Sequence, residues 1–348
     1  MNVIQVRSPF TIHIDESGQL ATQLKLYIWN KGDAEPTVPN YTLSKDVPSI
    51  VNRLCKYNIS KYLQEFIDPI TAVKTGVIDV ENNKAWCFFR VERYSCLSSK
   101  DMALLDTTDY IGLNGFYDSI GNAQVNESIN YKQLIYQNNY NYEKNKQGYF
   151  NLLVDFDVHD YQINYSTAGF NYYFRLRDIF DFSGVNLLKI PYAYNVSYSV
   201  SLYSLDNDET IFTINSIPVY ESRYTPIECS FINARGGWQF LTFFKASSNS
   251  ISVKGSEFET LTDGIVRGKS KVFNINGTEA VKCNTGWVDE NYNILIRDLL
   301  LSETVLLDGK PAKLKTKSQT YKTELYDKLI NYEIEFEYNY DLINNVVW

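Results

Sequence analysis

One short run of the sequence, Asp155, Asp157 and His159, has residue types and a spacing that could bind a metal ion. Positions i, i+2 and i+4 of a β-strand lie on one face, so two carboxylates and an imidazole would project together and could hold a divalent cation. The apolar residues that alternate with them would point into the core: Val154, Phe156 and Val158. No fourth ligand can be named, and an ordinary solvent-facing strand explains the same alternation. We therefore favour a solvent face and predict no metal site.

Nucleophilic catalysis by a Ser-His-Asp or Cys-His group needs an imidazole, and the chain has 2 histidines, His13 and His159. His13 lies in an alternating segment, residues 11–15, and not at a sharp strand-to-helix turn. Neither glycine-rich phosphate-binding pattern is present, and residues 206–209 lack the Gly and the terminal Glu of a calcium loop. These patterns predict a chain that is not an enzyme and that has no catalytic residues and no cofactor.

Three other kinds of site remain as alternatives. The 41 acidic residues could include a carboxylate pair for glycoside hydrolysis, but a sequence gives no such geometry. Exposed aromatic residues such as Tyr140 and Tyr142 could stack on sugars, although a general bias toward aromatic residues accounts for them equally well. The lysine-rich strip at residues 310–322 could face nucleic acid, but a solvated strand face or a protected sheet edge is the simpler interpretation.

The length and composition predict a folded chain with two to three domains, and the net charge argues against binding to phosphate backbones. The 348 residues are 44% hydrophobic and 21% charged, as in globular proteins, and 33 basic against 41 acidic residues give a net charge of −8. The 5 cysteines form no C-x-x-C pair and, being odd in number, make a poor disulfide framework, which favours a reducing compartment. No apolar signal-peptide region or membrane-spanning run is present, so we expect no membrane span.

Short runs with period-2 alternation dominate the chain and predict antiparallel β-structure. Two helices are expected, one capped by Ser60 and one amphipathic helix near 289–301 capped by Asp289 or Asn291. The polar-aromatic segment Tyr131–Gln147 is expected to be a long surface excursion without a regular element. Strands and hairpin turns are expected at these places: Leu24–Trp29, Asp206–Asp208, Ala234–Gly237, Asp308–Gly309, Ala312–Lys317 and Tyr332–Tyr340.

The fold class that follows is mainly β, an antiparallel multi-domain β-sandwich or Ig-like architecture with one or two short helices. We expect an N-terminal β-rich domain at 1–149 with a long loop near 101–149, and a small middle β-sandwich at 150–226. A C-terminal β domain at 227–348 would carry the amphipathic helix. In that domain the lysines of one strand, Lys313 to Lys317, should face the glutamates of the last strand, Glu333 to Glu337, because opposite charges across an antiparallel pair attract.

Several phrases in order resemble structural tail proteins of tailed bacteriophages that infect Bacteroidetes, including crAss-like phages. In the first part of the chain these phrases are Ser8–Phe10, Leu26–Trp29, Tyr41–Lys45, Tyr57–Ser60 and Glu65–Ile67. In the last part they are Phe231–Trp238, Thr242–Lys245, Thr285–Glu290, Leu299–Glu303 and Asn331–Glu337. Residues from about 70 to 225 carry no such phrase.

The resemblance implies a β-rich virion protein of the tail hub, distal-tail or fibre-attachment kind. Such a protein is assembled in the host cytoplasm with other virion tail proteins, and we do not expect it to bind nucleic acid specifically. Such a protein acts by subunit assembly, so we expect a homo-oligomer. The alternative is a receptor- or glycan-binding module of a tail fibre or a cell-surface adhesin, which would serve host attachment. The side chains expected at subunit contacts come from one aromatic strand and from the 131–147 excursion: Trp238, Phe240, Phe244, Tyr140 and Tyr142.

Overall fold

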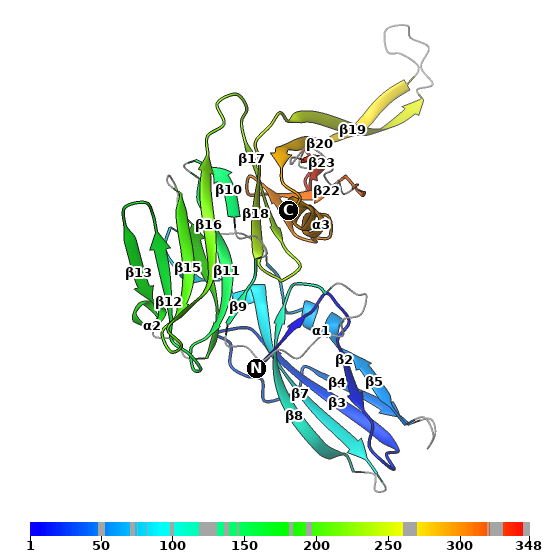
Figure 1. The fold of residues 1–348 in the computed structure, drawn as a ribbon. Coiled ribbons are helices and arrows are strands. Elements are labelled where there is room, and N and C mark those ends of the chain that lie inside the picture. Colours follow the sequence, from blue (N-terminus) through cyan, green and yellow to red (C-terminus); the bar gives the residue numbers. More distant parts are fainter. Residues whose placement is uncertain are drawn as a thin grey trace. The chain divides into compact units, whose positions relative to one another are not determined.

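The computed structural model shows a mainly β chain, 57% strand and 7% helix, with several antiparallel sheets and three short helices (Figure 1). This confirms the expected fold class of a multi-sheet β-sandwich architecture. The structure describes residues 1–47, 53–69, 74, 76–81, 83–97, 101–117, 131–135, 139–144, 146–180, 184–192, 197–259, 270–318, 320 and 330–343.

The chain forms two compact units. The first unit comprises residues 1–140, 145–217 and 232–239, and the second comprises 141–144, 218–231 and 240–348. The domain boundaries expected at 149/150 and 226/227 stay a prediction.

The first part of unit 1 is a five-stranded sheet with a two-stranded ribbon and a short helix on one face (Figure 1). The sheet order is β1 (Asn2–Gln5), β8 (Ala103–Leu113), β7 (Trp86–Cys96), β3 (Ala21–Trp29) and β4 (Tyr41–Asp46). The ribbon pairs β2 (Thr11–Ile14) with β5 (Cys55–Asn58), and α1 (Ser60–Gln64) follows it. Strand β3 alternates as the sequence predicts, with Leu24, Leu26 and Ile28 buried in the core between the layers.

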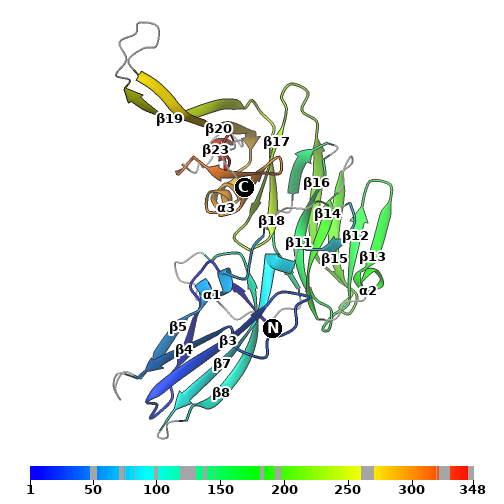
Figure 2. The ribbon, with the colours of Figure 1, turned by 180° about the vertical axis from the view of Figure 1, so that it is seen from behind.

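The second part of unit 1 is a sandwich of two sheets. One sheet has the order β10 (Asn139–Glu143), β16 (Glu209–Val219), β15 (Tyr198–Ser204), β12 (Tyr161–Ser166) and β13 (Asn171–Arg175). The other has the order β6 (Asp79–Val80), β14 (Val185–Tyr192), β11 (Gly148–Asp155) and β9 (Tyr131–Gln133). Figure 2 shows the two sheets from behind. They meet where the rings of Phe150 and Phe212 contact at 6.1 Å and where the Tyr165 hydroxyl donates to the Pro191 carbonyl at 3.0 Å.

The prediction that residues 131–147 form no regular element is wrong. Strands β9 and β10 lie in this segment, and Leu134 and Ile135 beside β9 are 0% and 1% exposed. Long-range pairing with β11 organises the segment, since Tyr131 to Gln133 lie opposite Val154 to Leu152. A polar-aromatic composition does not prevent a strand whose hydrogen-bond partner comes from a distant part of the chain.

Unit 2 is built on a seven-stranded sheet and one amphipathic helix. The sheet order is β18 (Trp238–Phe243), β17 (Ile227–Ile232), β21 (Val305–Leu307), β22 (Lys310–Leu314), β23 (Ile330–Tyr338), β20 (Ser270–Val288) and β19 (Ser248–Glu259). The expected helix is confirmed as α3 (Tyr292–Leu300), whose buried face includes Leu295, Ile296 and Leu299. Its cap position is Asn291, and the carboxylate of Asp289 accepts the Asn291 N–H at 3.0 Å.

Two expected charge pairs across β22 and β23 are confirmed. Lys313 lies directly opposite Glu337, with the ammonium 2.9 Å from the carboxylate, and Lys315 contacts Glu335 at 2.7 Å. The turn before β22 is also as expected, because Asp308 and Gly309 both adopt positive φ (44° and 77°).

The remaining elements are two short helices, a 3-10 turn and two hairpins. Ser60 is the first residue of α1 and not its cap, because its hydroxyl is used elsewhere: it accepts the Phe10 N–H and donates to the Ser8 carbonyl, both at 2.7 Å. The one-turn helix α2 (Leu176–Ile179) follows β13, and a 3-10 turn covers Asn83–Ala85. The expected hairpins at 206–208 and 234–237 are both present.

Candidate assembly interface

The most exposed feature of unit 2 is a long two-stranded arm formed by β19 and the first part of β20. The strands pair from Ser248 opposite Lys282 to Glu259 opposite Ser270, and all twelve residues of β19 are exposed. In both views the arm projects away from the other strands of unit 2 (Figures 1 and 2). We call residues 248–259 and 270–279 the arm.

One side of the arm carries four aliphatic side chains, with Glu257 and Glu279 on the same side. Ile251 and Val253, two residues apart, share a face. A methyl group added at Gly255 would lie 3.3 Å from Val272 and 3.4 Å from Ile275, so these two side chains lie on that face as well. The four aliphatic side chains keep between 45% and 61% of their surface exposed. They form the aliphatic face of the arm.

Two phenylalanines pack together near the far end of the arm. The rings of Phe258 and Phe273 contact edge to face with centroids 5.6 Å apart. Phe258 is still 46% exposed and Phe273 41% exposed. An aromatic pair of this geometry contributes about 0.5–1.5 kcal/mol beyond its buried area, which stabilises the ribbon where no other layer covers it.

The arm is fixed at its base by the rest of unit 2. From Ala280 to Val288, β20 pairs with β23, and Cys283 is completely buried in the core there. The chain near its end adds three hydrogen bonds: the Leu342 N–H donates to the Gly277 carbonyl at 2.8 Å, and the Asn276 side chain bonds the backbone of Ile343 twice at 3.0 Å. The arm is therefore a rigidly rooted extension of the sheet.

An isolated two-stranded hairpin is marginally stable in water, and contiguous exposed apolar surface marks a site of interaction. Strand β19 is also the edge of the seven-stranded sheet, and a long edge strand is a template for pairing with another chain. Native edges are normally shielded by inward charges, prolines or short length. The twelve-residue edge of β19 has no proline, and its first half alternates Ile251 and Val253 with serines, while Lys254 and a register shift between Lys254 and Ser256 interrupt the second half. The first half therefore has the properties of a surface that another chain covers.

The residues expected at subunit contacts lie elsewhere, and most are buried. Trp238, Phe240 and Tyr142 are 2%, 5% and 4% exposed, so their side chains belong to the interior of this chain and are not presented to a neighbour. Phe244 is half-buried just after β18. Tyr140 belongs to β10, and its side chain lies outside the described part of the structure.

Hydrogen bonds around Trp238 show how this aromatic strand is held inside the chain. Its backbone N–H donates to the buried side chain of Asn151 at 2.7 Å, and the neighbouring Asn233 donates to the Leu134 carbonyl at 2.7 Å. The turn between β17 and β18 belongs to unit 1 and is hydrogen-bonded within that unit, and a Cβ at Gly236 (φ 85°) would meet Leu113 at 2.9 Å.

The three residues with metal-ligand spacing do not share a strand face. Strand β11 ends at Asp155, whose carboxylate accepts the Asp157 N–H at 3.1 Å in a turn, and Val158 is 49% exposed instead of buried. His159 turns to Asp206, with Nδ1 3.2 Å from its carboxylate. The Asp160 N–H also donates to Asp206, and these hydrogen bonds hold the pKa of that carboxyl below its ordinary value.

Across the described residues, no three His, Cys, Asp or Glu side chains lie together in an arrangement that could hold a metal ion. The His159 pair is accordingly a link between the start of β12 and the turn that follows β15.

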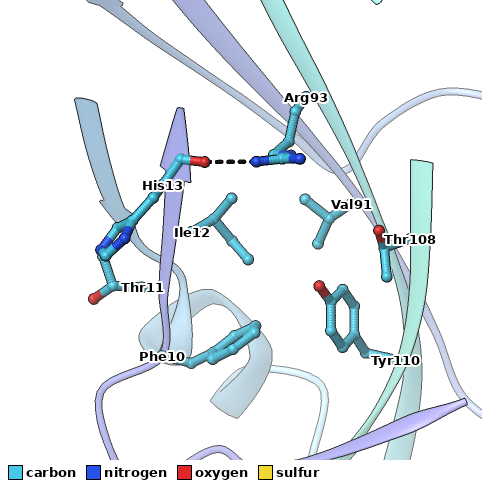
Figure 3. A pocket seen from close by; sticks show the side chains of 8 residues that line it. All are labelled: Phe10, Thr11, Ile12, His13, Val91, Arg93, Thr108 and Tyr110. Atoms are coloured by element: carbon cyan, nitrogen blue, oxygen red, sulfur yellow. Dashed lines mark hydrogen bonds between the residues drawn. The ribbon is translucent and has the colours of Figure 1, made fainter. Parts of the chain in front are cut away.

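A groove of about 310 Å³ lies between β2 and the strands β7 and β8 of unit 1 (Figure 3). Arg93 crosses it, donating to the His13 carbonyl at 2.8 Å and from Nε to the Asp106 carboxylate at 2.7 Å. The His13 ring points away from the guanidinium, and the buried Tyr110 closes the floor (Figure 3). Burial raises the pKa of Tyr110, and the guanidinium of Arg93 lowers that of Asp106.

Across this groove, Arg93 links strand β2 to strands β7 and β8. The polar groups of Arg93 are all directed at protein partners, and none of the side chains that line the groove is a serine or cysteine beside an imidazole. A second groove of about 380 Å³ lies between β4 and β5, beside Tyr57 and Tyr62. The two grooves flank the β2–β5 ribbon.

No protein-family model and no curated protein sequence matches this chain. No helix in the described part of the chain is both long and apolar enough to cross a membrane.

Proposed function

We propose that this chain is a structural protein of the virion tail of a tailed bacteriophage, a hub, distal-tail or fibre-attachment component that acts by subunit assembly and not by catalysis. Its partners are other virion tail proteins and further copies of itself. The sequence resemblance supports the tail assignment, and the arm supports assembly as the mode of action.

The observation that carries the proposal is the exposed aliphatic face of the arm. Ile251 and Val253 stand on an edge strand where the described residues leave them 59% and 61% exposed, and a further chain would bury them.

A second copy of this chain is the proposed occupant. An antiparallel, two-fold pairing of β19 with itself, centred on Ser252, places Ile251 and Val253 of one copy opposite Val253 and Ile251 of the other. The contact is then self-complementary, as two-fold symmetry requires.

The tail assignment is tested on particles of the phage whose genome encodes the chain. Gold-labelled antibody against the purified chain is expected to mark the tail in negative-stain images, and the chain should be found in washed particles by mass spectrometry. Its absence from washed particles, or label on the capsid alone, contradicts the assignment.

A further inference from the structure

The outer face of the β12–β13–β15–β16 sheet in unit 1 has an unusual chemistry. One row of directly paired residues crosses all four strands: Tyr173, Asn164, Ser201 and Thr213. Every member of the row carries an uncharged hydroxyl or amide.

A second row runs parallel to the first on the same face, two residues further along each strand. Its members are Asn171, Ser166, Ser199 and Asn215, again all uncharged amides and hydroxyls. We call these two rows the neutral face.

The neutral face is the solvated side of the sheet. The residues that alternate with it, including Ile163, Val200 and Ile214, are 0% exposed and form the core of the sandwich. At the edge strand β13, Tyr173 is 60% exposed, so its ring is open to a ligand.

Hydrogen bonds between neighbouring side chains hold the neutral face in a fixed arrangement. The hydroxyls of Ser201 and Thr213 lie 3.0 Å apart, the Ser199 hydroxyl donates to the Asn215 amide oxygen at 2.8 Å, and the Gln162 amide donates to Asn164 at 2.6 Å. A network of this kind sets which way each amide points before a ligand arrives.

Other solvated sheet faces of the same chain are charged. The outer face of the first sheet pairs Arg90 with Asp109 at 2.7 Å, and β22 and β23 pair Lys313 with Glu337. A general compositional bias would act on all of these faces alike, so the absence of charge from the two rows is a local property. Arg175, a cation on the neighbouring pair of β12 and β13, is bonded to Asp160, its Nε donating to the carboxylate at 2.8 Å.

We propose that the neutral face binds a neutral polysaccharide. Sugar hydroxyls both donate and accept hydrogen bonds, and amide and hydroxyl side chains supply the matching groups in both senses. The apolar C–H face of a sugar ring packs on an exposed aromatic ring such as Tyr173, whose hydroxyl stays in water. An extended, pre-arranged and uncharged sheet suits a long neutral polymer, whereas a nucleic acid or an acidic glycan requires cations. This inference does not depend on the tail assignment.

The test is native affinity electrophoresis of the full chain in gels that contain a soluble glucan, mannan, xylan or galactan, with acidic polygalacturonate as the charged contrast. We expect at least one neutral polymer to retard the chain. Replacing Tyr173→Ala or Asn164→Ala should weaken that binding by about tenfold or more. Because the face is uncharged, retardation should be unchanged between about 0.05 M and about 0.5 M NaCl.

The matched control is Tyr172→Ala on the same strand. Tyr172 is 52% exposed, close to the exposure of Tyr173, but its side chain is on the opposite side of the sheet. This variant should bind within about twofold of the wild type, and thermal unfolding should show that all variants are folded. No retardation by any neutral polymer, retardation by polygalacturonate alone, or equal loss in Tyr172→Ala and Tyr173→Ala would each overturn the proposal.

Discussion

Replacing both central aliphatic residues of the arm, Ile251→Ser with Val253→Ser, should weaken self-association without unfolding the chain. Full burial of such a side chain contributes about 1.5–3 kcal/mol. The two residues are 59% and 61% exposed in the single chain, so covering that remaining surface contributes about 0.9–1.8 kcal/mol for each. The double variant therefore loses about 1.8–3.6 kcal/mol for each arm buried. A two-fold dimer buries two arms, so its dissociation constant should rise by about 400-fold or more.

Sedimentation velocity over a concentration series measures this change directly. The matched control is Ser250→Ala with Ser252→Ala, which changes the alternate positions of the same strand, where apolar contact with a partner is not expected. The control should keep the wild-type association, and thermal unfolding should place all three proteins within about 1 kcal/mol of each other because the changed side chains are exposed. Equal association in the wild type and the Ile251/Val253 variant would refute the assignment of the arm as the contact.

The remaining predictions concern stability and thiol reactivity. Asn151→Leu removes the acceptor of the buried Trp238 N–H (2.7 Å) and should lower the free energy of unfolding by about 2–4 kcal/mol in urea titrations, whereas a loss below about 0.5 kcal/mol would contradict the bonding described. Asp106→Asn should lower the melting temperature near about pH 7, where the carboxylate is charged beside Arg93. Because the pKa of Asp106 in the folded chain lies below its ordinary 3.8, the difference in melting temperature between wild type and variant should fade as the pH falls through that lowered pKa. A difference that persists in acid would contradict the Asp106–Arg93 ion pair as the cause. Burial raises the pKa of Cys87 to about 12, so iodoacetamide should modify this thiol in urea but not in the native chain, as peptide mass spectrometry can show.

Local patterns predicted much of the fold. The strand at 24–29, the helix α3 and the hairpin at Asp308–Gly309 all depend on spacing or turn residues within a few positions, and each is present. The cross-strand pairing of Lys313 with Glu337 was also readable, because the turn before β22 and the strict alternation of β23 leave few registers open.

The sequence could not predict which strands are buried and which are exposed. The arm strands alternate in the same way as β3, and only the tertiary structure shows that β3 lies under another layer while Ile251 and Val253 do not. Conversely, the strand that begins at Trp238 looked like an aromatic surface but is enclosed on both faces. Residues 131–133 became a strand because β11, distant in sequence, offers its edge.

The neutral face was equally hidden from the sequence. Its two rows draw single residues from four strands between 164 and 215, and only the observed register places Tyr173 beside Asn164 and Ser201. The serines and asparagines of this region are scattered along the chain, where they resemble ordinary solvent-facing positions of a strand.

The solution mass of the wild-type chain, measured by light scattering across a concentration series, tests the central claim most directly. The account predicts a mass that rises above the 40.3 kDa of one chain to a fixed multiple as copies cover each other's arms. A mass that stays at 40.3 kDa at every concentration would contradict it, because the aliphatic face would then remain open to water in the presence of its proposed partner.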